Sequence, residues 1–217
     1  MSDRFAKTTA ALRYWLLGQG YYRALDALEY GRELHTGLRK DGRTPEFQHQ
    51  VDIANYVRCL PNLIHPEDSI VTAILHDTGE DKSRQVSLNQ LIDRFGPTAG
   101  NAIVRVTKKT HETVRDEDEL YADMEQCPIA SIIKGADRMH NQGSMPGVFE
   151  AQKMERTMLF TEERILPMLK NARRRFPQQE AAYELIKVSL VTQNAMVRAM
   201  SNDDNNPDKP SELGLSL

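Results

Sequence analysis

The chain has 217 residues, of which 40% are hydrophobic and 27% are charged, which is typical of one globular domain. Its net charge of −3 argues against a general nucleic-acid-binding protein, which normally carries a basic surface. The two cysteines, Cys59 and Cys127, are too few for a disulfide framework. The first 20 residues lack an extended apolar core, which argues against a signal peptide or a membrane span. We therefore expect a cytoplasmic protein.

Apolar residues recur at helical spacing along the chain, while alternation of β-branched residues is almost absent. This pattern predicts an all-α fold. The predicted helices cover residues 5–17, 20–37, 46–60, 67–78, 87–95, 97–107, 117–125, 128–141, 150–174 and 178–200. Glycine and proline mark most of the breaks between them. Residues 201–217 are polar, contain proline and have few apolar side chains, so we expect this tail to be disordered.

The stretch LHDTGEDKS, at residues 75–83, combines one histidine with three carboxylates: His76, Asp77, Glu80 and Asp81. On one continuous helix these four side chains would lie at about 0°, 100°, 40° and 140° and would share one side. Carboxylates packed this closely repel one another unless a cation lies among them. The stretch therefore predicts a site for a divalent cation.

An adjacent histidine and aspartate cannot close a metal site alone, so further ligands must come from elsewhere in the chain. The candidates are His49 in FQHQVDIANYV and Asp137 in IIKGADRMHN. Both lie inside apolar helical segments, where an unpaired polar group is costly. The ordinary alternatives are a hydrogen-bonded core histidine for His49, and an ion pair with Lys134 or Arg138 for Asp137.

Five blocks of sequence carry a resemblance to a known family. In chain order they are ALEYGRELHTGLRKDGRTPEFQHQVDIA, VTAILHDTGEDKS, LIDRFG, IVRVTKK and IIKGADRMHN. With these blocks the chain resembles the HD-domain superfamily of metal-dependent phosphohydrolases. Within it, the chain is similar to the hydrolase domain of the Rel/Spo alarmone enzymes and to the stand-alone small alarmone hydrolases. The resemblance implies a single HD-type domain over residues 1–200, with a core at about 21–145 and a helical extension at 146–200.

The resemblance also implies a reaction and the residues that perform it. The implied substrate is the nucleotide guanosine tetra- or pentaphosphate, cleaved at the 3′-pyrophosphate to give GDP or GTP and pyrophosphate. The implied site consists of the metal ligands His49, His76, Asp77 and Asp137, usually for one manganese ion; the water-activating pair Glu80 and Asp81; and the nucleotide contacts Arg39, Lys40 and Asn141.

Three positions depart from the family pattern without removing a ligand. Gln50 replaces a proline, Gly79 lies inside the HDxxED signature, and Gly135 replaces a leucine. A glycine within a helix costs roughly 1 kcal/mol relative to alanine, so Gly79 suggests a bent or closely packed signature. These changes leave two alternatives open: an HD enzyme for another phosphorylated small molecule, such as NADPH at its 2′-phosphate, and a non-catalytic nucleotide-binding module. Glu80 and Asp81 argue against the second.

Several nearby residues have ordinary interpretations. Arg39 and Lys40 also suit plain helix-end charges, which the helix dipole favours. His140 lies one turn from Asp137 and is expected to serve in packing, and Lys108 is expected in a solvated loop. The helical extension is a candidate for covering the pocket or for forming a homo-oligomer face.

Overall fold

The computed structural model describes residues 3–39 and 41–204, and within these ranges it contains helices and two isolated β-bridges but no strand. This confirms the all-α prediction. The α-helices are α1 (Asp3–Gln19), α2 (Tyr22–Leu34), α3 (Gln48–Val57), α4 (Pro66–Leu75), α5 (Thr78–Asp81), α6 (Leu88–Phe95), α7 (Pro97–Val106), α8 (Glu117–Met124), α9 (Pro128–Gly143), α10 (Ala151–Phe160), α11 (Leu166–Arg175) and α12 (Glu180–Asp204). None of the described helices is long and apolar enough to cross a membrane.

The helix predicted at 150–174 is divided by a π-helical turn, η1 (Thr161–Ile165), between α10 and α11. Pro167 follows this turn, and it has no N–H to donate to the carbonyl of Glu163 one turn back. A short 3₁₀ turn, η2 (Pro177–Gln179), then precedes α12. Because α12 continues to Asp204, the first four residues of the predicted disordered tail are helical. The rest of that tail lies outside the described residues.

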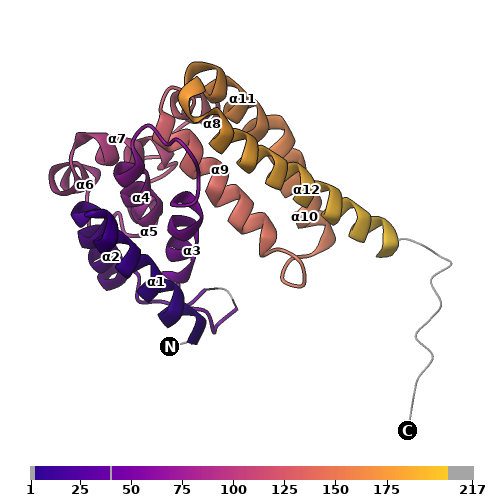
Figure 1. The fold of residues 1–217 in the computed structure, drawn as a ribbon. Helices are drawn as coiled ribbons and strands as arrows, with labels where there is room; N and C mark the ends of the chain where they lie inside the picture. The colour runs from indigo at the N-terminus through magenta and orange to yellow at the C-terminus, as the bar shows by residue number, and fades with distance from the viewer. Residues whose placement is uncertain (1–2, 40, 205–217) are drawn as a thin grey trace, which may run out of the picture.

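Helix α9 lies at the centre of the molecule. It packs against α3, α4 and α7 on one side and against α11 and α12 on the other. Figure 1 shows this arrangement, with α9 between the indigo and purple N-terminal helices and the orange to yellow layer of α10, α11 and α12. Buried apolar side chains from both sides belong to one hydrophobic cluster. The position of α9 is therefore set by both parts of the chain.

Gly135 allows the C-terminal helices to approach α9. A Cβ atom at this position would lie 2.8 Å from Cγ2 of Ile186 and 3.0 Å from Cδ2 of Leu169. Buried hydrogen bonds also join these helices: Gln142 Nε2 donates to Asn194 Oδ1 at 2.5 Å. Close packing and paired polar groups thus fix α9, the helix that carries Asp137.

Candidate metal centre

Three separate segments bring the four predicted metal ligands together. His49 lies on α3, His76 and Asp77 lie at the junction of α4 and α5, and Asp137 lies on α9. His49 Nε2 is 3.2 Å from Asp137 Oδ1 and 3.7 Å from Asp77 Oδ2. His76 Nε2 is 3.2 Å from Asp77 Oδ1 and 3.8 Å from Asp137 Oδ1. Two imidazole nitrogens and two carboxylates therefore converge on one point.

The HDxxED signature does not lie on one continuous helix, so the single-helix assumption made from the sequence was wrong. Helix α4 ends at Leu75. Asp77, at φ −85° and ψ −11°, then starts the single turn of α5, and its carbonyl accepts hydrogen bonds from the amides of Glu80 at 3.1 Å and Asp81 at 2.8 Å. Consequently, His76 and Asp77 lie between two helices, while Glu80 and Asp81 lie on α5.

The hydrogen bonds of His76 fit a metal ligand. Nδ1 lies 2.8 Å from the carbonyl of Ala73, which can only accept, so Nδ1 carries the proton. Nε2 then has its lone pair free in the neutral ring. This atom is buried and has no hydrogen-bond partner among the residues that the structure describes. Leaving such a group unsatisfied costs about 1–3 kcal/mol, and a divalent cation would satisfy it.

Charges at the centre shift the pKa values of its groups in different directions. Burial lowers the pKa of His49. Burial also opposes the charged form of His76, but the nearby charges of Asp77 and Asp137 outweigh it and raise the pKa of His76 to about 9. The pKa of Asp137 lies well below its usual range, because Lys134 and the two histidines outweigh the effect of burial. A cation and a proton would thus compete for His76 Nε2.

Other side chains hold the two carboxylates of this candidate site in place. Gln50 is buried and its Nε2 donates to Asp77 Oδ2 at 3.2 Å. Lys134 Nζ pairs with Asp137 Oδ2 at 3.2 Å. The ion pair considered as an alternative to metal binding is therefore present, but it uses Oδ2, whereas Oδ1 faces the histidines. Asn141, predicted as a nucleotide contact, donates from Nδ2 to Asp137 Oδ1 at 2.6 Å.

The predicted water-activating pair is placed beside the centre on α5. Glu80 Oε1 accepts a hydrogen bond from the backbone amide of Lys108 at 2.7 Å. The carboxylate of Asp81 lies near His35 and Glu46, with one potential ligand atom of each residue within 4.8 Å of the others. Partial burial raises the pKa of Asp81, and the negative charges of Asp77 and Glu46 raise it further. The ionised Asp81 carboxylate is therefore more basic than that of an ordinary aspartate.

The group formed by His35, Glu46 and Asp81 is less suited to a metal ion than the first centre. His35 Nδ1 lies 2.8 Å from Glu46 Oε1, and its Nε2 lies 3.2 Å from Thr78 Oγ1. Lys82 Nζ approaches Glu46 Oε1 at 3.0 Å. A protein cation thus already neutralises Glu46, and both ring nitrogens of His35 have partners. The His35 side chain is buried.

Gly79 allows the signature to pack closely against its neighbours. A Cβ atom here would lie 2.4 Å from Oγ1 of Thr107 and 2.8 Å from Cδ2 of Leu88. Two contacts tether the loop after Thr107 to the signature: the amide of Lys108 to Glu80, and the amide of His111 to Ser83 Oγ at 3.0 Å. The close packing suggested by a glycine within the signature is confirmed.

Of the two predicted basic contacts, the structure describes Arg39 alone. Lys40 lies outside the described residues. The neighbouring Arg39 donates its backbone amide to the carbonyl of Thr44 at 2.8 Å, in a loop closed by a bridge between Leu38 and Pro45. No contact that the structure describes joins the side chain of Arg39 to the metal ligands. Its loop nevertheless begins beside His35 and leads directly into α3.

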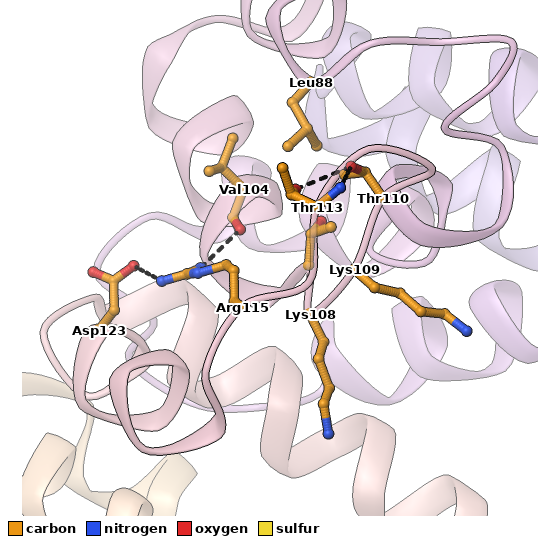
Figure 2. Close-up of a pocket in the computed structure, with 9 residues that line it drawn as sticks. Leu88, Val104, Lys108, Lys109, Thr110, Thr113, Arg115 and Asp123 are labelled. Atoms are coloured by element: carbon orange, nitrogen blue, oxygen red, sulfur yellow. Dashed lines mark hydrogen bonds and ion pairs between the residues drawn. The ribbon is translucent and has the colours of Figure 1, made fainter.

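The loop after α7 borders a small hollow of about 140 Å³. Figure 2 shows Arg115 at one side of it, between Asp123 and the carbonyl of Val104, while the side chain of Lys109 extends away from Leu88. Lys108 Nζ pairs with Glu117 at 2.6 Å. Ligand pockets usually measure about 300–1,000 Å³, so this hollow is too small for a nucleotide.

No protein-family model matches the chain, and no curated protein matches it. The geometry of the centre and the sequence motifs therefore carry the functional argument.

Proposed function

We propose that the chain is an HD-type, metal-dependent phosphohydrolase that cleaves guanosine tetra- or pentaphosphate at the 3′-pyrophosphate. The products would be GDP or GTP and pyrophosphate. The observation that carries the proposal is the buried Nε2 of His76, which has no hydrogen-bond partner among the described residues and lies at the point where His49, Asp77 and Asp137 also converge. The resemblance to the alarmone hydrolases supplies the reaction and the substrate class.

When bound, a divalent ion, which we propose to be Mn²⁺, supplies charge neutralisation at phosphate oxygens and a lowered pKa for water in the site. The chain's own residues prepare the site for this role. Gln50 orients the carboxylate of Asp77, while Lys134 and Asn141 hold that of Asp137. These contacts restrict the rotation of both carboxylates, and Oδ1 of Asp77 and Oδ1 of Asp137 both lie toward His76.

We assign different roles to Glu80 and Asp81, the two acidic residues of α5, because their surroundings differ. Glu80 has one carboxylate oxygen committed to the Lys108 amide, which suits it to orienting the attacking water. Asp81 has a raised pKa, and no backbone amide among the described residues donates to its carboxylate, which suits it to accepting the proton of that water. A well-placed general base contributes roughly 10²–10⁴ to the rate. From the sequence alone, Glu80 is the stronger candidate for proton transfer because it lies one turn from His76, and this assignment reverses that order.

The substrate's remaining charge needs cations near the centre. Arg39 and Lys40 are the proposed holders, since the loop that carries Arg39 begins next to the buried His35. A second candidate is hydrolysis of another phosphorylated small molecule, such as NADPH at its 2′-phosphate. The amide of Asn141 is committed to Asp137, so it is not a free contact for either substrate.

A turnover assay separates these possibilities. The purified chain with Mn²⁺ is given guanosine tetraphosphate labelled at its 5′-diphosphate and, in parallel, NADPH. We expect labelled GDP and unlabelled pyrophosphate. Release of label from the 5′ end, or turnover of NADPH alone, would contradict the proposed substrate.

Two variants test the proposed base. Asp81→Asn should retain Mn²⁺ affinity and lose turnover by a factor of roughly 10² or more. The control is Asp93→Asn, which makes the same change at an exposed position on α6 and should leave turnover unchanged. Loss of Mn²⁺ together with activity in Asp81→Asn would make Asp81 a ligand and not a base.

A further inference from the structure

Helix α12 has an apolar face toward solvent in addition to the face that packs on the core. The buried face consists of Ala182, Tyr183, Ile186, Leu190, Asn194 and Val197. On the outer side, Leu185, Val188, Val191 and Met196 are each 48–60% exposed. In Figure 1, α12 runs the length of the C-terminal layer, and its last turns extend beyond α10. A surface helix normally has charged and polar residues on its outer face, so this apolar face indicates an interaction surface.

The outer face of α12 follows the spacing of a coiled-coil seam. Six exposed residues are separated alternately by four and three positions, and none of them is charged: Ala181, Leu185, Val188, Thr192, Ala195 and Ala199. In heptad notation these six residues, the α12 seam, are successive d and a positions, which face the partner helix in a two-helix coiled coil. The seam extends over about 27 Å at a rise of 1.5 Å per residue. The face therefore has the period that packing against another long helix requires.

The α12 seam is complementary to itself when two copies run antiparallel. A twofold axis beside residue 190 places opposite each other the pairs Ala181 and Ala199, Leu185 and Ala195, and Val188 and Thr192, with one member of each pair from each copy. The bulkiest residue of the seam, Leu185, thus meets an alanine, and Val188 meets a residue of similar size. Self-complementarity of this kind is what a twofold interface between identical chains needs.

Residues beside the seam favour the antiparallel direction. The g positions of the heptads are Glu184, Val191 and Arg198. In an antiparallel pair g positions face g positions, so Glu184 lies near Arg198 of the second copy and Val191 meets its own counterpart. In a parallel pair Glu184 and Val191 would instead face Ser189 and Met196, and Glu184 would gain no cation. Charge complementarity therefore selects the antiparallel arrangement.

The two charged g residues have ion-pair partners in their own chain that leave capacity for a second contact. Arg198 Nη2 lies 2.7 Å from both carboxylate oxygens of Glu162, while its Nη1 has no partner among the side chains that the structure describes. Glu184 contacts Arg173 through Oε1 and Lys187 through Oε2, and a carboxylate accepts up to about four hydrogen bonds. A contact between Glu184 and Arg198 across an interface would thus join these pairs into one network.

We propose that α12 forms a homodimer interface, in which the α12 seam packs antiparallel against the same seam of a second copy of the chain. The second copy is the occupant that the face fits, because the seam and its flanking charges both match their own reverse order. The inference is independent of the proposed metal centre, since no residue of the seam is a predicted ligand.

Sedimentation of the full chain over a range of concentrations tests the proposal. Wild type should reach about twice the mass of one chain and dissociate on dilution. Val188→Glu places a charge in the middle of the seam, at a side chain 59% exposed in the single chain. It should keep the wild-type circular dichroism and raise the dimer dissociation constant by roughly 100-fold or more. The matched control Val148→Glu, at a loop valine 58% exposed, should dimerise as wild type does. A monomeric wild type, or a Val188→Glu chain that dimerises as wild type does, would overturn the inference in favour of another partner for this face.

Disulfide cross-linking tests the direction of the two helices. Cys59 and Cys127 are first replaced by serine, so that each introduced cysteine is the only thiol of its chain. A mixture of Leu185→Cys and Ala195→Cys chains should form the mixed disulfide. Leu185→Cys alone should form little, because the two copies of residue 185 would lie about 15 Å apart along the axis, beyond the reach of a disulfide. Cross-linking of Leu185→Cys with itself but not with Ala195→Cys would overturn the antiparallel arrangement.

Discussion

Replacement of Gly79 by alanine tests whether close packing shapes the signature. The added Cβ would lie 2.4 Å from Thr107 Oγ1 and 2.8 Å from Leu88 Cδ2. Thr107 cannot rotate away without a cost, because it is β-branched and its hydroxyl donates to the carbonyl of Ile103 at 2.8 Å. Overpacking of this kind costs about 1–3 kcal/mol, whereas alanine gains at most about 1 kcal/mol over glycine in a helix. We expect a net loss of about 1–2 kcal/mol in the free energy of unfolding.

Urea unfolding of Gly79→Ala and of a matched control measures this effect. Gly18→Ala makes the same substitution near the end of α1, where a Cβ would have no neighbour within 4 Å among the described residues. It should be neutral or stabilising by up to about 1 kcal/mol. In a double-mutant cycle, Thr107→Ala should relieve part of the cost of Gly79→Ala. A Gly79→Ala chain as stable as wild type, with strictly additive effects in the cycle, would refute the packing argument.

Three further predictions follow from other contacts. Gln50→Leu should weaken Mn²⁺ binding by about tenfold, because Asp77 loses its hydrogen-bond donor, as calorimetry would show; unchanged affinity would contradict this role. Burial raises the pKa of Tyr183 to about 12, so the unfolded chain loses its phenolic proton first and stability should fall as the pH rises from about 10 to 12. Denaturant titrations should show that Tyr183→Phe removes this component, and an unchanged slope would exclude Tyr183 as its source. Asn194→Leu should lower the free energy of unfolding by about 1–3 kcal/mol, since it leaves the buried Nε2 of Gln142 without its acceptor; thermal unfolding measures this, and a loss below about 1 kcal/mol would count against it.

Much of the fold was predictable because most helices have regular apolar spacing and clear glycine or proline boundaries. The inward position of His49 and Asp137 beside His76 was also predictable, since each is a polar residue in an apolar helical segment. The turn at Asp77 could not be predicted, because its dihedral angles remain close to helical and the helical spacing of the side chains continues through it. The contact of Gln50 with Asp77 was missed because it joins α3 to the start of α5. Its only signal in the sequence is that Gln50 directly follows His49.

The metal content of the purified chain tests the central claim most directly. Elemental analysis after incubation with Mn²⁺ and removal of free ion should find about one equivalent in wild type. His65→Ala, at an exposed histidine before α4, should bind the same amount. His76→Ala should retain helical circular dichroism but bind essentially no metal, because it lacks the buried Nε2 that has no other partner among the described residues. Equal metal content in wild type and His76→Ala would contradict the proposed centre.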